Sequence, residues 1–326
     1  MRSRDPAAPE RPARQPAVNP AAMIPAGADL AARVAADRHG LVERFERAAR
    51  QARRRTDPEA VHDVRVATRQ LEAALDLWRS VLPPRRRRRA RRALRQLRRA
   101  LGPAREARIC LKLLNERMGG LAPEARVAAG LVQSLLQRRL ERLEGRAARR
   151  CARDERERLR SRFERAWEGT APIMGPGTFA LESARARLQQ RRARARDTLR
   201  DAIKAPGDER FHAARLAVKR WRYVLERFAA AEPDTDRSEQ RWLRSVQETL
   251  GRIQDLAVLR DCITRMYAPD TPAEPTTLSA GVRGLLIDFE AERARYVSEF
   301  GRQAVAVAPA PPVVLEPRRA PRWGEA

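Results

Sequence analysis

The sequence has few lysines, few aromatic residues and no long apolar run, and each shortage excludes a class of protein. Only three of its 69 basic residues are lysines, so arginine carries almost all of the positive charge. Aromatic residues make up 5% of the chain, while Ala, Leu, Arg and Glu dominate, a composition that favours helices over sheets. Because no 18 apolar residues follow one another, no membrane-spanning helix is expected. We therefore predict a soluble, all-α protein.

Cysteine is also scarce. Cys110, Cys151 and Cys262 lie far apart in the sequence, are odd in number and include no C-x-x-C pair, which argues against a disulfide framework and a zinc site. This pattern is typical of a reducing compartment. The first residues contain no apolar segment like that of a secretory signal, so we expect a cytoplasmic location.

Positive charge is present in large excess. The 69 Lys+Arg stand against 42 Asp+Glu, which gives a formal net charge of +27 over 326 residues. Biased codon usage would explain arginine in place of lysine, but not this imbalance. Such an excess repels itself unless a polyanion or an acidic surface neutralises it. With 43% hydrophobic residues the chain can still bury a core, so we expect a folded protein with a negatively charged partner.

Amphipathic helices are predicted for almost the whole chain between two proline-rich tails. Prolines recur in residues 1–28 and 306–326, so both tails are predicted to be disordered. The strongest internal break is GTAPIMGPGT at 169–178, which we interpret as a linker between halves 29–168 and 179–305. Helices are expected at 29–54, 58–82, 85–117 with a kink at Pro103, 124–168, 179–204, 209–230, 236–267 and 279–305.

An internal repeat relates the two halves. The motif H-x-x-R-x-A-x-[RK] occurs at 62–69 and again at 212–219, an offset of 150, and the Leu-Gly step that begins 101–106 recurs in 250–255. Three arginine pairs share an offset of 149, namely Arg88 with Arg237, Arg92 with Arg241 and Arg95 with Arg244. The chain is therefore predicted to be a duplicated helical unit.

The repeated motifs place basic side chains on one helix face and apolar side chains on the other. At about 100° per residue, the basic faces carry His62, Arg65 and Arg69 in the first copy and His212, Arg215, Lys219 and Arg222 in the second. The opposite faces carry Val64, Leu71, Leu75, Trp78 and Leu82, and Val218, Trp221, Leu225 and Phe228. We expect the apolar faces to form a core and the basic faces to point away from it.

The segment RRRRRARRALRQLRR at 85–99 adds a face made of arginine alone. Arg88, Arg92, Arg95 and Arg99 follow one side of the expected helix. Like charges at i and i+4 destabilise a helix by about 0.2–0.5 kcal/mol each. A row with almost no interleaved acid is therefore tolerated best where an anion binds, although a solvated surface is the better interpretation for Arg85–Arg89 alone.

The sequence shows no recognisable catalytic or metal site. His62 and Asp63 resemble the His-Asp pair of metal phosphohydrolases, but the second copy has Ala213 in place of the acid, and further ligands are missing. No nucleophile stands beside a base in the sequence. We therefore expect no enzymatic activity, no cofactor and no metal.

With these motifs the chain resembles the CHAD family, the conserved histidine α-helical domain. The resemblance is carried by 62–83, 97–114, 211–228 and 249–263 and extends over about 29–305. It implies two four-helix bundles related by a pseudo-two-fold axis, a basic central channel that binds inorganic polyphosphate, and, in some members, association with polyphosphate granules. The candidate polyphosphate-binding residues are His62, Arg65, Arg69, Arg88, Arg92, Arg95, Arg99, Arg105, His212, Arg215, Lys219, Arg220, Arg222, Tyr223, Arg237, Arg241 and Arg244.

Gln70 and Glu72 depart from the family, which usually continues with basic residues after the position of Arg69. On this ground the first-half site is expected to bind more weakly than the second, where Lys219 and Arg220 are present.

Three other functions stay open at this point. A nucleic-acid binder fits the charge, although Trp78, Trp221 and Phe228 lie on core faces and only Tyr223 is left to stack on bases. An enzyme acting on phosphoanhydrides would need acidic metal ligands, and a helical scaffold would present its basic face to an acidic protein. Binding of polyphosphate without catalysis is favoured, because arginine forks suit bidentate contacts with phosphate oxygens.

Overall fold

The computed structural model describes residues 30–54, 57, 59–170, 179–232, 235, 238–267 and 277–305. Within these ranges all regular secondary structure is helical, which confirms the predicted fold class. The two proline-rich tails and residues 171–178 of the predicted linker lie outside the described residues.

The helices follow the predicted order along the chain. Their bounds are α1 (Leu30–Arg54), α2 (Ala60–Leu77), α3 (Pro84–Ala100), α4 (Gly102–Arg117), the short 3₁₀ helix η2 (Met118–Gly120), α5 (Pro123–Arg150), α6 (Arg153–Arg165), α7 (Phe179–Lys204), α8 (Asp208–Ala231), α9 (Ser238–Met266) and α10 (Thr277–Val305). Proline stands in the first two positions of α3, α4 and α5, where its missing N–H costs no hydrogen bond.

One predicted helix, 85–117, is broken rather than kinked. It forms α3 and α4, which meet at Leu101. Pro103 causes the break, because its ring clashes with the carbonyl four residues earlier and it has no N–H to donate. The equivalent position in the second half is Arg252, and there α9 runs through without interruption.

The prediction of a single helix at 124–168 is wrong. The chain leaves the helical conformation at Ala152, which has φ −57° and ψ 158°, and α6 starts one residue later. No glycine or proline marks this break. It lets α6 turn back against α3 and bury Leu159 and Phe163, and Asp154 and Glu155 then stabilise the new N-terminus through the helix dipole. Burial of this apolar pair, which is a tertiary effect, decides the break.

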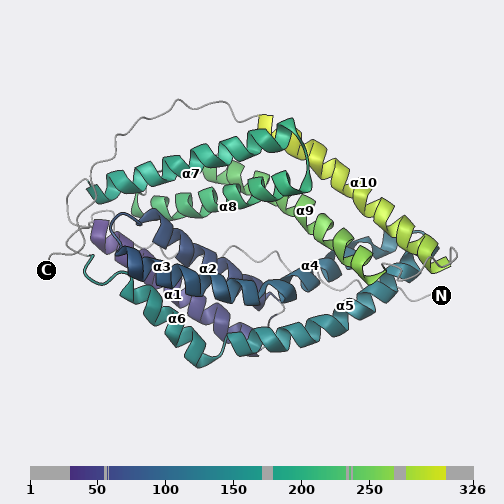
Figure 1. The fold of residues 1–326 in the computed structure, drawn as a ribbon, viewed down its shortest axis with the longest axis horizontal. Coiled ribbons are helices and arrows are strands. Elements are labelled where there is room, and N and C mark those ends of the chain that lie inside the picture. Colours follow the sequence, from purple (N-terminus) through teal and green to yellow (C-terminus); the bar gives the residue numbers. More distant parts are fainter. Residues whose placement is uncertain are drawn as a thin grey trace, which may run out of the picture.

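The helices of the two halves pack on one another in two cores (Figure 1). In the larger core, α1 packs on α2, α7 packs on α8, and α2 meets α8 across the halves. The smaller core lies where α4, α5, α9 and α10 converge, on the right of Figure 1. Both cores draw on both halves, and the arrangement as two pseudo-symmetric four-helix bundles stays a prediction.

The predicted apolar faces are buried. Val64, Leu75, Val218 and Trp221 are each at most 1% exposed, and Trp78 is 3% exposed. Because α2 and α8 contribute these residues to one core and also touch each other, their basic faces come together along the contact between the halves. None of the described helices combines the length and apolarity that crossing a bilayer requires.

Candidate functional site

A pocket of about 300 Å³ lies between α2, α3, α7 and α8, and we call it the basic pocket. Eight basic and two acidic side chains contribute to its wall. Its lining residues are Arg69, Glu72, Ala73, Asp76, Arg91, Arg95, Arg98, Arg99, Arg191, Leu216, Lys219, Arg220, Tyr223 and Val224. Both halves of the chain therefore supply positive charge to one cavity.

Glu72 neutralises part of the arginine row on α3. Its carboxylate accepts hydrogen bonds from Arg95 Nε at 2.8 Å and Arg98 Nη1 at 2.6 Å, and Arg91 lies 3.5 Å away. Burial alone would raise the pKa of Glu72, but Arg98 and Arg95 outweigh it and the pKa is lowered. The row that looked free of acids in the sequence thus obtains one from α2.

Asp76 plays the same part for α7. It accepts hydrogen bonds from Arg187 at 2.5 Å and from Arg191 at 2.7 Å, and these arginines lower its pKa in spite of burial. Both acids of the basic pocket are therefore ionised and held by arginines.

Other bases of the pocket have no acidic partner within the described residues: Arg69, Arg99, Lys219 and Arg220 form no ion pair there. The pKa of Lys219 lies well below its ordinary value, first because the ammonium is buried and then because Arg215 and Arg69 repel its proton. Burial and the charges of Arg98 and Arg215 lower the pKa of Arg69 to about 10. An anion in the pocket would relieve this repulsion.

The positive cluster continues from the pocket along α2 and α8 towards α4 and α9. Arg215 lies 3.6 Å from Asp255, and Arg105 lies 3.1 Å from Glu59. Arg65 donates a hydrogen bond to the Arg98 carbonyl. Burial raises the pKa of Asp255, although Arg215, Lys219 and Arg105 act in the opposite direction. Asp255 is thus one acid among several bases that repel one another.

The two repeated histidines lie in different surroundings. His62 is partly buried, and burial together with the charges of Arg105 and Lys219 lowers its pKa to about 4. His212 is exposed, and its Nδ1 lies 2.7 Å from the amide oxygen of Gln254. Arg105 and Gln254 occupy equivalent positions of the repeat, so His62 has a cation where His212 has an amide, and His62 is also the more buried of the two.

This helical arrangement, with its paired His-Arg motifs, matches a known family. Residues 19–264 match the CHAD domain, which is more than half of the chain. The protein belongs to the CHAD domain family. The resemblance noted from the sequence motifs is thereby confirmed, and the matched range ends within α9.

Two solved structures share the fold of this CHAD domain. The crystal structure of the CHAD domain from the plant Ricinus communis is 22% identical, with a TM-score of 0.66, and the alignment covers 91% of this chain and 98% of that one. PptA from Streptomyces chartreusis is 20% identical, with a TM-score of 0.62 and coverage of 86% and 100%. No curated protein matches the chain.

The candidate residues of the CHAD domain fall into three groups. Arg69, Arg95, Arg99, Lys219, Arg220 and Tyr223 line the basic pocket. His62, Arg65, Arg105 and Arg215 form the cluster that continues from it. The pocket lining does not include Arg88, Arg92, Arg241 and Arg244, which are exposed on α3 and α9, nor His212 and Arg222, while Arg237 lies outside the described residues.

Three basic lining residues were missed in the sequence. Arg91 and Arg98 lie seven positions apart on α3, each next to a member of the predicted arginine row, and they line the pocket together with Arg95 and Arg99 of that row. Arg191 enters from α7, and no local pattern distinguishes it from the other arginines of that helix.

Tyr223 is not an exposed platform for bases. It is 6% exposed, and the Arg222 guanidinium lies over its ring at 4.4 Å. Arg222 in turn donates to Glu226 and, at 2.8 Å, to Gln247. Arg222 and Tyr223 are therefore engaged in contacts within the CHAD domain itself.

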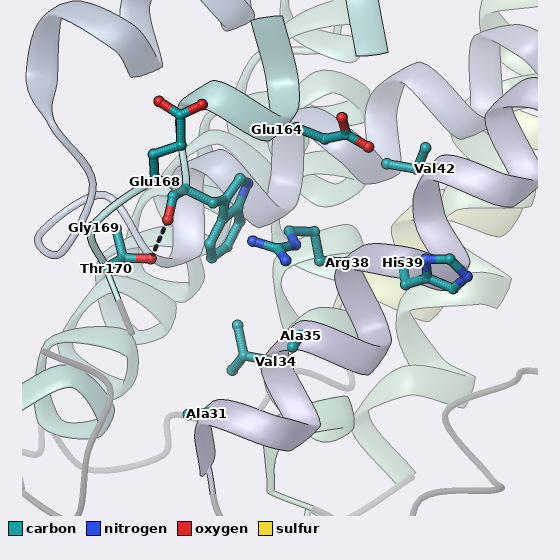
Figure 2. Close-up of a pocket in the computed structure, with 11 residues that line it drawn as sticks. Ala31, Val34, Ala35, Arg38, His39, Val42, Glu164, Glu168, Gly169 and Thr170 are labelled. Atoms are coloured by element: carbon teal, nitrogen blue, oxygen red, sulfur yellow. Dashed lines mark hydrogen bonds between the residues drawn. The ribbon is translucent and has the colours of Figure 1, made fainter. Parts of the chain in front are cut away.

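A second cavity, of about 490 Å³, lies between α1 and the end of α6 (Figure 2). Its wall combines apolar side chains such as Val34 and Val42 with Arg38, Glu164 and Glu168. The Arg38 guanidinium lies over the Trp167 ring, 5.8 Å from the ring centre. No candidate residue lines it, and its acids make it less suited to an anion than the basic pocket.

The lowered pKa of His62 predicts that the folded protein becomes less stable at acidic pH. In the unfolded chain its pKa is near 6.5, and in the folded CHAD domain it is about 4, so the unfolded state binds more protons between these values. Stability should therefore fall as the pH drops through this window, by about 2 kcal/mol between pH 7.5 and pH 5 from His62 alone. Urea unfolding of the wild type and His62→Gln at both pH values measures this, and equal losses in the two proteins would contradict it.

Proposed function

We propose that this CHAD domain binds inorganic polyphosphate in the basic pocket, without catalysis. One observation carries the proposal: Arg69, Arg99, Lys219 and Arg220, two from each half, surround a pocket of about 300 Å³ and form no ion pair within the described residues. A bound anion would supply the missing negative charge. The same contacts would hold the protein at polyphosphate granules.

The chemistry of the side chains suits a linear chain of phosphates. Arginine forks form bidentate hydrogen bonds with phosphate oxygens, and such charge-assisted bonds are about twice as strong as neutral ones. The positive charges continue beyond the pocket to Arg65, Arg105 and Arg215, so a chain that enters it meets further cations. A series of such contacts favours a long polyanion over a single small anion.

Absence of catalysis is proposed from the state of the two pocket acids. Glu72 and Asp76 are each held by at least two arginines, which lower their pKa. A carboxylate in this state is a poor proton donor near neutral pH, and its oxygens are already occupied. Neither acid is therefore well placed to activate a water or to ligate a metal.

Polyphosphate is favoured over nucleic acid because the pocket offers no stacking surface. Tyr223 is buried under Arg222, and Trp221 is 1% exposed. Single-stranded nucleic acids gain about 1–3 kcal/mol for each base stacked on an aromatic ring. Without that gain, DNA would bind through its phosphates alone, as a weaker competitor.

A competition experiment tests the proposal. A labelled polyphosphate of about a hundred phosphates is bound to the full chain and displaced by unlabelled polyphosphate or by single-stranded DNA of equal phosphate concentration. We expect polyphosphate to displace the label at a concentration at least about tenfold lower, and affinity to fall steeply with salt as counterions are released. Equal displacement by both polymers would favour a general polyanion binder, and no binding would end the proposal.

Chain length should matter because the arginine row continues outside the pocket. Arg92 and Arg88 lie about one and two turns before Arg95 on α3, are exposed and have no ion-pair partner within the described residues. Long polyphosphate should therefore bind more tightly than triphosphate. Arg88→Ala with Arg92→Ala should weaken the long chain by about fivefold and leave triphosphate unchanged. Calorimetry measures both affinities. If triphosphate lost as much affinity as the long chain, the effect of these arginines would not depend on chain length, which would contradict the prediction.

Binding should also take up protons. Lys219 and His62 have lowered pKa values in the free protein because both are buried and because cations lie near them, and an incoming polyanion raises both. Affinity should therefore rise as the pH falls from about 8 to about 6. Calorimetry in two buffers of different ionisation enthalpy measures the uptake, and Lys219→Met with His62→Gln should abolish it. Undiminished uptake in this variant would assign the protons to other groups.

A further inference from the structure

Two of the three cysteines meet at the contact between the halves. Cys110 on α4 and Cys262 on α9 belong to the smaller core, where the two helices pack on each other, and they are 1% and 6% exposed. The Cys110 thiol donates a hydrogen bond to the Cys262 sulfur. Both are free thiols, so two sulfur atoms from opposite halves are in contact without a bond.

We propose that Cys110 and Cys262 form a reactive thiol pair, which a hydroperoxide converts into a disulfide joining the two halves. The proposal rests on the contact between the two sulfurs and is independent of polyphosphate binding. The third cysteine, Cys151, lies in the larger core and has no thiol neighbour within the described residues. It serves as an internal control.

The surroundings of the pair shift the pKa values of the two thiols in opposite directions, which gives the thiols different roles. The hydrogen bond from Cys110, with the charges of Arg139 and Arg265, lowers the pKa of Cys262 to about 6 against the effect of burial. The same hydrogen bond and burial raise the pKa of Cys110. Cys262 is thus the thiolate that attacks, and Cys110 is the thiol that resolves. Burial raises the pKa of Cys151 to about 11, which leaves it almost wholly protonated near neutral pH.

The reaction balances with hydrogen peroxide as the oxidant. The Cys262 thiolate attacks one oxygen, the O–O bond breaks, and the departing hydroxide takes up a proton to leave as water, so that Cys262 becomes a sulfenic acid. Cys110 then attacks this sulfur, the S–S bond forms, and a second water leaves. Two thiols are oxidised, and one peroxide is reduced to two waters.

The crosslink would join chain positions about 150 residues apart. A loop of this length loses much of its freedom in the unfolded state when it is closed, so the disulfide should raise the melting temperature by roughly 5 °C or more. It would also hold α4 against α9 within about two turns of Arg105 and Asp255.

Peptide mapping of the oxidised protein tests the proposal. The full chain is reduced, freed of reductant, treated with hydrogen peroxide near pH 7.4, unfolded in alkylating agent and digested with trypsin without reduction. We expect peptide 109–112 joined to 261–265, while Cys151 in 151–153 is still alkylated. Cys262 should react at least about tenfold faster than Cys151. A thiol reductant should restore both free peptides and the original melting temperature.

Other products would overturn the proposal. Cys262 oxidised to sulfinic acid beside an alkylated Cys110 would show that the sulfurs do not reach each other. Equal reaction at Cys151, or a crosslink only between two chains, would also reject it. Cys151→Ser should leave the crosslink intact, and Cys262→Ser should leave Cys110 as a free thiol. If Cys262→Ser fails to fold, the map of the wild type alone decides.

Discussion

Replacing Lys219 with methionine and Arg220 with alanine should weaken polyphosphate binding by about a hundredfold. Both side chains line the basic pocket, and neither forms an ion pair within the described residues. Each charge-assisted contact contributes about 1.5 kcal/mol or more, so two of them account for about two orders of magnitude in affinity. The fold should persist, because the depressed pKa of Lys219 shows that its charge opposes the folded state.

A matched loss of charge separates the pocket from general attraction. Arg138 and Arg142 are exposed on α5 and do not line the basic pocket. Replacing both with alanine removes the same two charges and should change the affinity by less than about threefold at physiological salt, where the Debye length is about 8 Å. Fluorescence titration of both variants at one salt concentration makes the comparison. Similar losses in the two proteins would mean that net charge, and not the pocket, determines binding.

Asp37→Ala should destabilise the protein by about 3–5 kcal/mol. Asp37 on α1 accepts a hydrogen bond from Arg227 on α8, and the two residues are 8% and 3% exposed. Removing the acid leaves a buried guanidinium without a counter-charge, which is far more costly than losing an exposed ion pair. Because the pair joins the two halves, the loss should appear as a lower midpoint of urea unfolding for the whole domain.

Two further variants identify the cause. Glu157→Ala removes an exposed ion pair with Arg153, 2.7 Å apart, and should leave the urea midpoint almost unchanged. Asp37→Leu combined with Arg227→Met removes both buried charges and should recover most of the stability lost in Asp37→Ala. If the double variant is as unstable as the single one, lost packing rather than the unpaired charge explains the effect.

Much of the candidate site could be predicted because helical periodicity is visible in the sequence. Spacing alone places Arg69 on the basic face of α2 and Lys219 on that of α8, and both residues do line the pocket. The repeat then indicated that two such faces exist. Residues that reach the pocket from another helix, such as Arg191, could not be identified, since spacing within one helix says nothing of which helix packs beside it.

The ion pairs between helices could also not be predicted from the sequence pattern. No acid lies within the arginine row on α3, yet Glu72 on α2 pairs with Arg95 of the row and with its neighbours Arg91 and Arg98. As a departure from the family pattern, Glu72 predicts a weaker first-half site. The structure makes it the acid that organises one wall of the basic pocket, while the relative strength of the two halves stays a prediction.

The sequence by itself determined the helical class, the buried apolar faces and the family, because each depends on local spacing or on a repeated motif. Only the tertiary structure decided the break at Ala152, the different surroundings of His62 and His212, and the contact between Cys110 and Cys262. These depend on the angles and offsets at which helices pack. Such offsets are determined by the summed burial of many side chains distant in the sequence, and no single segment carries that information.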